Sequence, residues 1–168
     1  PPDPETYTRQ AVELSRFAEE QGARGVVHVM PEGLPPRDGE THGDVILRYF
    51  TTVSQAVSVP VFIYQTPGTL KEYLATVELV QKLADLPNVA GMKASTADAG
   101  YILDMTWATR DKEFAYIVGN ETGWFAGLHS GARAVIGQGA TMNPEILNAV
   151  EQRVTGGDIQ GAMDAQRS

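Results

Sequence analysis

Apolar residues along the chain fall into two kinds of segment that alternate from one end to the other. In one kind they recur every three or four positions among polar residues, which predicts amphipathic helices. In the other they form short continuous runs rich in valine and isoleucine, which is typical of buried strands. The predicted helices cover residues 4–21, 44–57, 73–86, 99–109, 122–130, 144–154 and 158–166. The predicted strands cover residues 25–30, 61–64, 89–93, 114–118 and 132–137.

Local signals support both ends of the first predicted helix. Asp3 has the side chain of a good N-cap, Pro4 suits the first helical position, and Gly22 suits the end of a helix. Residues 31–41 are rich in proline and glycine, and this composition predicts a loop between the first strand and the second helix.

The five predicted strands are nearly all apolar instead of alternating, which is expected when both faces of a sheet are covered. Strands that alternate with helices predict a parallel α/β sheet, built as one strand–helix unit after another. This pattern fits either a doubly wound sheet or part of a (β/α)₈ barrel. No Gly-x-Gly-x-x-Gly follows the first strand, which disfavours a dinucleotide-binding sheet. A complete barrel has eight strands and typically ~250 residues, so this chain would supply only part of one.

Composition narrows the class of protein. The 168 residues fit one domain, and 42% are hydrophobic, which is enough for a core. The net charge of −8 with no basic cluster argues against a nucleic-acid partner, and no apolar stretch approaches the ~20 residues that span a bilayer. The absence of cysteine excludes disulfides, thiolate nucleophiles and cysteine-ligated metals, and it fits a reducing compartment, for which we expect the cytoplasm.

Two reactive side chains stand at the ends of successive predicted strands. Tyr64 closes the strand at 61–64, and Lys93 closes the strand at 89–93. Adjacent parallel strands lie ~4.8 Å apart, so the amine and the phenol can meet if both point the same way. A lysine that loses its charge on burial can attack a ketone and form a Schiff base. No group of His, Asp or Glu has the spacing of metal ligands, and His28, inside a strand, is expected to be a hydrogen-bonded core residue.

Three segments in order along the chain carry a resemblance to a known family. Residues 64–68 (YQTPG) resemble the family pattern YNxPG, residues 89–95 (VAGMKAS) resemble VxGIKxS, and residues 131–137 (GARAVIG) resemble its last barrel strand. The chain is thereby similar to the dihydrodipicolinate synthase / N-acetylneuraminate lyase family. The resemblance implies a (β/α)₈ barrel with a helical C-terminal extension, Lys93 as the Schiff-base lysine and Tyr64 as proton shuttle. It also implies no cofactor, no metal, and a homo-oligomer, either a dimer or a tetramer.

By the same resemblance, residues 1–156 are expected to form strands four to eight of the barrel with their helices, and residues 157–168 to begin the extension. The first three strands would lie outside this sequence. Five parallel strands leave open edges that a barrel would close, so we expect these 168 residues alone to be inactive or poorly folded.

The resemblance also implies substrate contacts, which are Thr69, Gly119, Glu121, Ile136 and Gln138. Thr69 stands where the synthases have an arginine that grips a carboxylate, and this departure favours a different substrate. A carboxylate at Glu121 would suit a polyhydroxylated chain because it accepts hydrogen bonds from hydroxyls, although it could equally serve as a helix N-terminal acid. Gln138 matches a lyase position that contacts substrate, and Ile136 would pack near the iminium.

The departures from the synthases extend to the first loop, where Glu32 and Gly33 replace a pair of tyrosines. The leading hypothesis is therefore a lyase or aldolase that forms a lysine Schiff base with a 2-oxo acid, either pyruvate-like or sugar-derived. It would catalyse aldol cleavage, condensation or dehydration. The alternatives are dihydrodipicolinate synthase itself and a non-catalytic barrel of the family that binds a ligand or mediates assembly. An unrelated doubly wound sheet is a further alternative, and it predicts that Tyr64 and Lys93 do not share a cavity.

Overall fold

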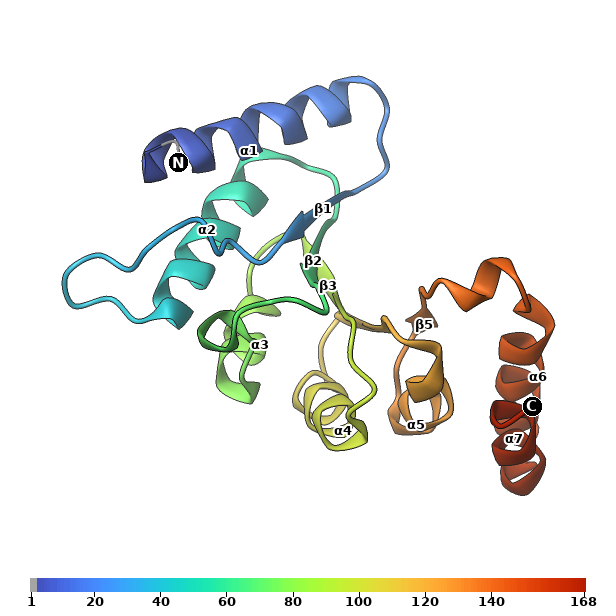
Figure 1. Ribbon diagram of the computed structural model, residues 1–168. Coiled ribbons are helices and arrows are strands. Elements are labelled where there is room, and N and C mark those ends of the chain that lie inside the picture. Colours follow the sequence, from blue (N-terminus) through green and yellow to red (C-terminus); the bar gives the residue numbers. More distant parts are fainter. Residues whose placement is uncertain (1–2) are drawn as a thin grey trace.

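The computed structural model describes residues 3–168 as one five-stranded parallel sheet with helices between its strands (Figure 1). The strands are β1 (Val26–Val29), β2 (Val61–Gln65), β3 (Val89–Ala94), β4 (Ala115–Val118) and β5 (Ala134–Val135). The α-helices are α1 (Pro4–Glu20), α2 (His42–Ala56), α3 (Val77–Leu83), α4 (Ala99–Ala108), α5 (Trp124–Ser130), α6 (Pro144–Thr155) and α7 (Ile159–Gln166). Single 3₁₀ turns are η1 (Lys71–Tyr73), η2 (Glu121–Gly123) and η3 (Gly139–Thr141).

The strand order separates the two architectures that the sequence left open. The strands lie in the sheet in the order β1-β2-β3-β4-β5, and every neighbouring pair is parallel. A doubly wound sheet reverses its strand order at a switch point and carries helices on both faces. Here the order never reverses, and Figure 1 shows the helices in an arc outside the strands, with successive helices from α1 to α6 packed on each other. The fold is therefore part of a (β/α)₈ barrel.

The core lies between the strands and this arc of helices. Alternate residues of β2 point into it, with Val61 and Ile63 fully buried. Phe50 of α2 and Leu83 of α3 are equally buried on the helical side. This apolar layer fixes the register of the strands, because a slip of one residue would turn every buried side chain to the other face.

In the described part of the chain, no helix covers the opposite face of the sheet (Figure 1). Val27 and Val29 of β1 project from it and are 64% and 47% exposed. Tyr64 and Lys93 belong to the same face, because they alternate with the buried residues of their strands. The sequence pattern led us to expect cover on both faces, whereas within residues 3–168 only one face is covered. In a closed barrel, this bare face is the interior.

Several element boundaries differ from the predicted ones. The predicted helix at 73–86 is instead the turn η1 followed by α3, because the Thr76 side chain accepts a hydrogen bond from the Leu79 amide and caps a new helix there. The predicted strand at 132–137 pairs with β4 only over Ala134–Val135. The helix predicted from residue 44 begins two residues earlier, at His42, which packs edge-on against Tyr73.

Among the described residues, no helix combines the length and the apolar character that crossing a bilayer requires.

Candidate functional site

Lys93 and Tyr64 are direct neighbours across two central strands. The register of β2 and β3 pairs Tyr64 with Lys93, and both side chains leave the bare face near the carboxyl ends of their strands. The Lys93 Nζ atom lies over the Tyr64 ring, 4.4 Å from its centroid. No carboxylate among residues 3–168 forms an ion pair with Lys93. The predicted meeting of amine and phenol is therefore present in the structure.

Ser95 joins this pair, and sequence reasoning did not single it out. Its Oγ lies 3.3 Å from the Tyr64 hydroxyl, within hydrogen-bonding reach. This hydrogen bond, and next the positive charge of Lys93, lower the pKa of the Tyr64 phenol from its ordinary value, against the opposing effect of burial. The signal that could have identified Ser95 is its position two residues after Lys93, because residues i and i+2 of an extended segment share a face.

The three side chains line one cavity of about 410 Å³ at the carboxyl ends of the strands. Its walls come from the segments that follow β2, β3, β4 and β5. The lining residues are Tyr64, Pro67, Lys93, Ser95, Gly119, Asn120, Glu121, Ile136, Gly137 and Gln138. Six of the seven residues expected at the site are thus gathered around a single space, and Thr69 is the exception.

Thr69 is absent from the lining of that cavity. Its hydroxyl lies 3.1 Å from the hydroxyl of Thr66, and its amide donates to the Thr66 carbonyl, so both groups belong to the turn after β2. A substrate contact at Thr69 stays a prediction.

Glu121 holds its carboxylate across the cavity wall instead of capping its own helix. The Gly139 amide donates to its Oε1. The capping role belongs to Asn120, whose side chain accepts from the Thr122 amide at 3.1 Å. A Cβ atom on Gly137 would collide with the Glu121 carboxylate, so a larger residue there would push the carboxylate out of its present position. The opposite side of the segment is tied to α7, because Gln166 donates to the Glu121 carbonyl.

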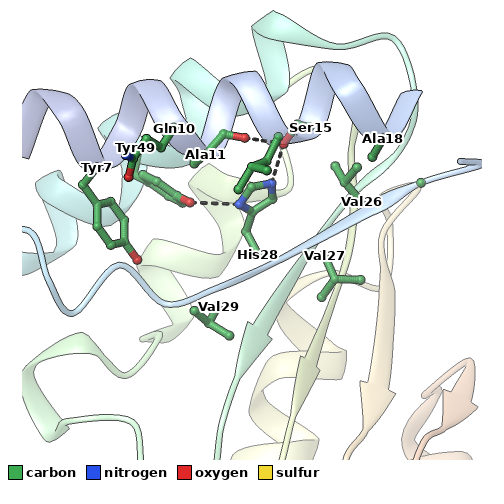
Figure 2. A pocket seen from close by; sticks show the side chains of 12 residues that line it. Tyr7, Gln10, Ala11, Ser15, Ala18, Val26, Val27, His28, Val29 and Tyr49 are labelled. Atoms are coloured by element: carbon green, nitrogen blue, oxygen red, sulfur yellow. Dashed lines mark hydrogen bonds between the residues drawn. The ribbon is translucent and has the colours of Figure 1, made fainter. Parts of the chain in front are cut away.

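A larger hollow of about 590 Å³ lies between α1 and β1, and its chemistry differs (Figure 2). His28 projects from β1 toward α1, where its Nε2 lies 2.8 Å from the Ser15 hydroxyl and its Nδ1 lies 2.9 Å from the Tyr49 hydroxyl. Burial lowers the pKa of His28 and raises the pKa of Tyr49. The prediction that His28 is a hydrogen-bonded core residue is confirmed by this geometry.

Within the described part of the chain, no three His, Cys, Asp or Glu residues come together as a metal site would require. The cavity at Lys93 therefore offers an amine, a phenol, a serine hydroxyl and one carboxylate. These groups suit covalent chemistry on a carbonyl compound, with hydroxyls to move protons.

The chain is similar to known proteins over nearly its whole length. A model of the dihydrodipicolinate synthetase family matches residues 6–168. The 4-hydroxy-tetrahydrodipicolinate synthase of Acidiphilium cryptum is 32% identical over 162 residues, which are 95% of this chain and 52% of that protein. The chain spans about half the length of the curated relatives that it matches.

Solved structures of other proteins have a fold similar to that of this chain. The chain is similar, with a TM-score of 0.82 and 24% identity, to YagE, a prophage protein of the dihydrodipicolinic acid synthase family from Escherichia coli K12 in complex with pyruvate. That match covers 95% of this chain and 53% of the other. N-acetylneuraminate lyase from Mycoplasma synoviae gives a TM-score of 0.72 at 20% identity, covering 95% of this chain and 51% of the other. The chain belongs to the dihydrodipicolinate synthetase family.

Proposed function

We propose that this chain carries the covalent centre of a lyase or aldolase that acts on a 2-oxo acid through a Schiff base on Lys93. The observation that carries the proposal is the pairing of Tyr64 with Lys93 across β2 and β3, with the amine 4.4 Å from the ring centroid and both side chains in one cavity. A phenol beside an amine supplies the proton transfers that imine formation needs.

The reaction begins when the neutral Lys93 amine adds to the ketone carbon and forms a C–N bond. The carbonyl oxygen takes up a proton from the Tyr64 phenol, and the positively charged nitrogen of the adduct returns one proton to the phenolate. A second proton from the phenol then releases the oxygen as water. The resulting iminium withdraws electrons from the neighbouring carbon. A C–C bond one position further along can then break or form, or a hydroxyl there can leave, and hydrolysis finally returns the free amine and the 2-oxo acid.

The substrate class follows from the neighbours of the amine. Glu121 and Gln138 line the same cavity, and a carboxylate and an amide can both accept hydrogen bonds from hydroxyl groups. We propose that they contact a hydroxylated chain extending from the 2-oxo acid. The pyruvate complex of the related YagE and the fold shared with N-acetylneuraminate lyase support this class.

A second candidate is dihydrodipicolinate synthesis itself, which the names of the curated relatives favour. One residue of this chain argues against that activity, since Thr69 replaces the carboxylate-binding arginine of the synthases. A rate assay with pyruvate and an amino-aldehyde, compared with release of pyruvate from sugar-derived 2-oxo acids, distinguishes the two. The homo-oligomeric assembly and the cytoplasmic location expected above stay predictions.

The deciding experiment is borohydride reduction of the full-length protein in the presence of pyruvate, followed by intact mass measurement. The proposal predicts one added pyruvate-derived mass per chain and no addition in Lys93→Arg, because a guanidinium is not a nucleophile at neutral pH. A folded wild-type protein that gains no mass would refute it and favour a non-catalytic barrel.

A further inference from the structure

Ser95 stands one residue beyond β3, and its backbone is held in place from both sides. Its amide donates to the Gln65 carbonyl of β2 at 3.0 Å, which extends the ladder past the last paired residue. On the other side, the Gly119 amide donates to the Ala94 carbonyl at 2.9 Å. The backbone at Ser95 is thus fixed between two neighbouring strands, and its side chain follows Lys93 on the bare face.

Gly119 provides the space in which the Ser95 hydroxyl sits. A Cβ atom on Gly119 would lie 2.7 Å from the Ser95 Oγ and 2.7 Å from the Ala94 carbonyl oxygen. Both distances are closer than real side chains tolerate, and backbone at this point cannot move without breaking the ladder. Any residue other than glycine at this position would therefore displace the hydroxyl from Tyr64.

From these two observations we propose that Ser95 is a positioning residue that holds the Tyr64 phenol beside Lys93 and shares its proton. The inference rests on the proposed function, because it assigns a partner to the phenol of that reaction. A serine hydroxyl can accept from a phenol and, after rotation, donate to a phenolate. The same contact therefore serves both states of a proton shuttle.

The hydrogen bond with Ser95 shifts the balance between phenol and phenolate toward the phenolate. A hydrogen bond to an ionised oxygen is about twice as strong as one between neutral groups, so Ser95 stabilises the phenolate more than the phenol. This is the physical reason why the pKa of Tyr64 lies below its ordinary value, with Ser95 as the largest cause. The 3.3 Å separation is long for two hydroxyls, as catalytic contacts often are before substrate binds.

The test follows Tyr64 in the full-length protein by NMR of isotope-labelled tyrosine, with its signal assigned by loss in Tyr64→Phe. Ser95→Ala should move the midpoint of the phenol titration upward, whereas Ser95→Thr, which keeps the hydroxyl, should restore it. Ser130→Ala serves as the matched control, since its hydroxyl bonds to the Gly127 carbonyl at the end of α5, away from this cavity. Gly119→Ala should act in the same direction as Ser95→Ala while leaving Ser95 intact.

The kinetic readout is the rate at which pyruvate forms the reducible imine. Ser95→Ala should slow it ~10-fold and move the alkaline limb of its pH profile with the phenol, since a general acid works best near its own pKa. An unchanged Tyr64 midpoint together with a wild-type imine rate in Ser95→Ala would overturn the inference. If the wild-type protein forms no imine, the proposed function fails, while the NMR midpoint still decides whether Ser95 acts on Tyr64.

Discussion

Two clusters in this molecule combine a nitrogen base with hydroxyl groups, and the surroundings of these groups differ between the clusters. At the α1–β1 groove, His28 sits between the hydroxyls of Ser15 and Tyr49 (Figure 2). At the carboxyl ends of the strands, Lys93 sits beside the hydroxyls of Tyr64 and Ser95. The first cluster packs a helix onto the sheet, and the second opens on a cavity.

The hydrogen bonds of the His28 cluster form a closed set. Ser15 donates its single proton to the Ala11 carbonyl at 2.7 Å, so toward His28 it must accept. The Nε2 atom therefore carries the ring proton, and Nδ1 accepts from the Tyr49 hydroxyl at 2.9 Å. Every polar atom of the trio has a partner inside the protein, so its protons are committed to internal hydrogen bonds.

The comparison teaches that the size of a hollow does not locate the chemistry. The groove at His28 has a volume of about 590 Å³ and the cavity at Lys93 about 410 Å³. What distinguishes the smaller cavity is its place at the carboxyl ends of parallel strands, where barrel enzymes carry their sites, and the convergence there of side chains from four strand ends.

The largest expected effect comes from Lys93→Arg. The substitution keeps the positive charge over the Tyr64 ring and removes the nucleophile. We expect turnover of a 2-oxo acid substrate to fall by roughly 10³-fold or more, as for the loss of other covalent catalysts. Steady-state kinetics of the full-length protein measures this, and activity within a few-fold of wild type would contradict the assignment of Lys93.

Tyr64→Phe should have the next largest effect. It removes the proton donor nearest the amine while keeping the ring under Lys93, so turnover should fall ~10²-fold with little change in stability. The control is Tyr49→Phe, which removes a phenol of the other cluster and should leave turnover of the folded protein unchanged. Equal losses of turnover in the two variants would erase the distinction between the clusters.

The same Tyr49→Phe variant should be the less stable of the two. It leaves the buried Nδ1 atom of His28 without its donor, and an unpaired buried polar group costs ~1–3 kcal/mol. Denaturant unfolding of both variants checks the ranking. A Tyr49→Phe protein as stable as wild type would show that the His28 hydrogen bonds contribute nothing to holding α1 and α2 on the sheet.

The smallest effect is a dependence of stability on pH. Because burial lowers the pKa of His28, the unfolded chain binds a proton more readily than the folded one. The contribution of neutral His28 is present above the unfolded value of ~6.5 and is lost as the pH falls below it. His28→Gln should therefore show a smaller drop in melting temperature between pH 7.5 and 5.5 than wild type. An equal drop in both proteins would locate the acid sensitivity elsewhere.

Much of the site could be predicted because short-range rules govern it. Strand ends and the two-residue period place Tyr64 and Lys93 on one face, and the same period extends to Ser95 once Lys93 is chosen. Thr69 illustrates what such rules miss. Its hydroxyl lies 3.1 Å from the Thr66 hydroxyl, and this local contact directs it into the turn after β2. No pattern in the sequence predicts which way the Thr69 hydroxyl points.

The fold shows the same division between local and distant causes. The three-residue spacing of apolar side chains predicts one helix over residues 73–86. In the structure, the Thr76 side chain caps a helix that begins only at Val77. Trp107 on α4 is 63% exposed, with Arg110 stacked on its ring, although an apolar side chain on a helix is ordinarily expected to pack. Which sheet face the helices cover depends on the handedness of every crossover, and a count of apolar residues per strand does not record it.

The most direct test of the central claim is a crystal structure of the full-length protein after borohydride reduction with pyruvate. The account predicts continuous density from the Lys93 Nζ to the former ketone carbon, with the Tyr64 and Ser95 hydroxyls beside that bond and no ligand at His28. Reduced pyruvate on another lysine, or a Lys93 amine turned away from Tyr64 with no adduct, would contradict it.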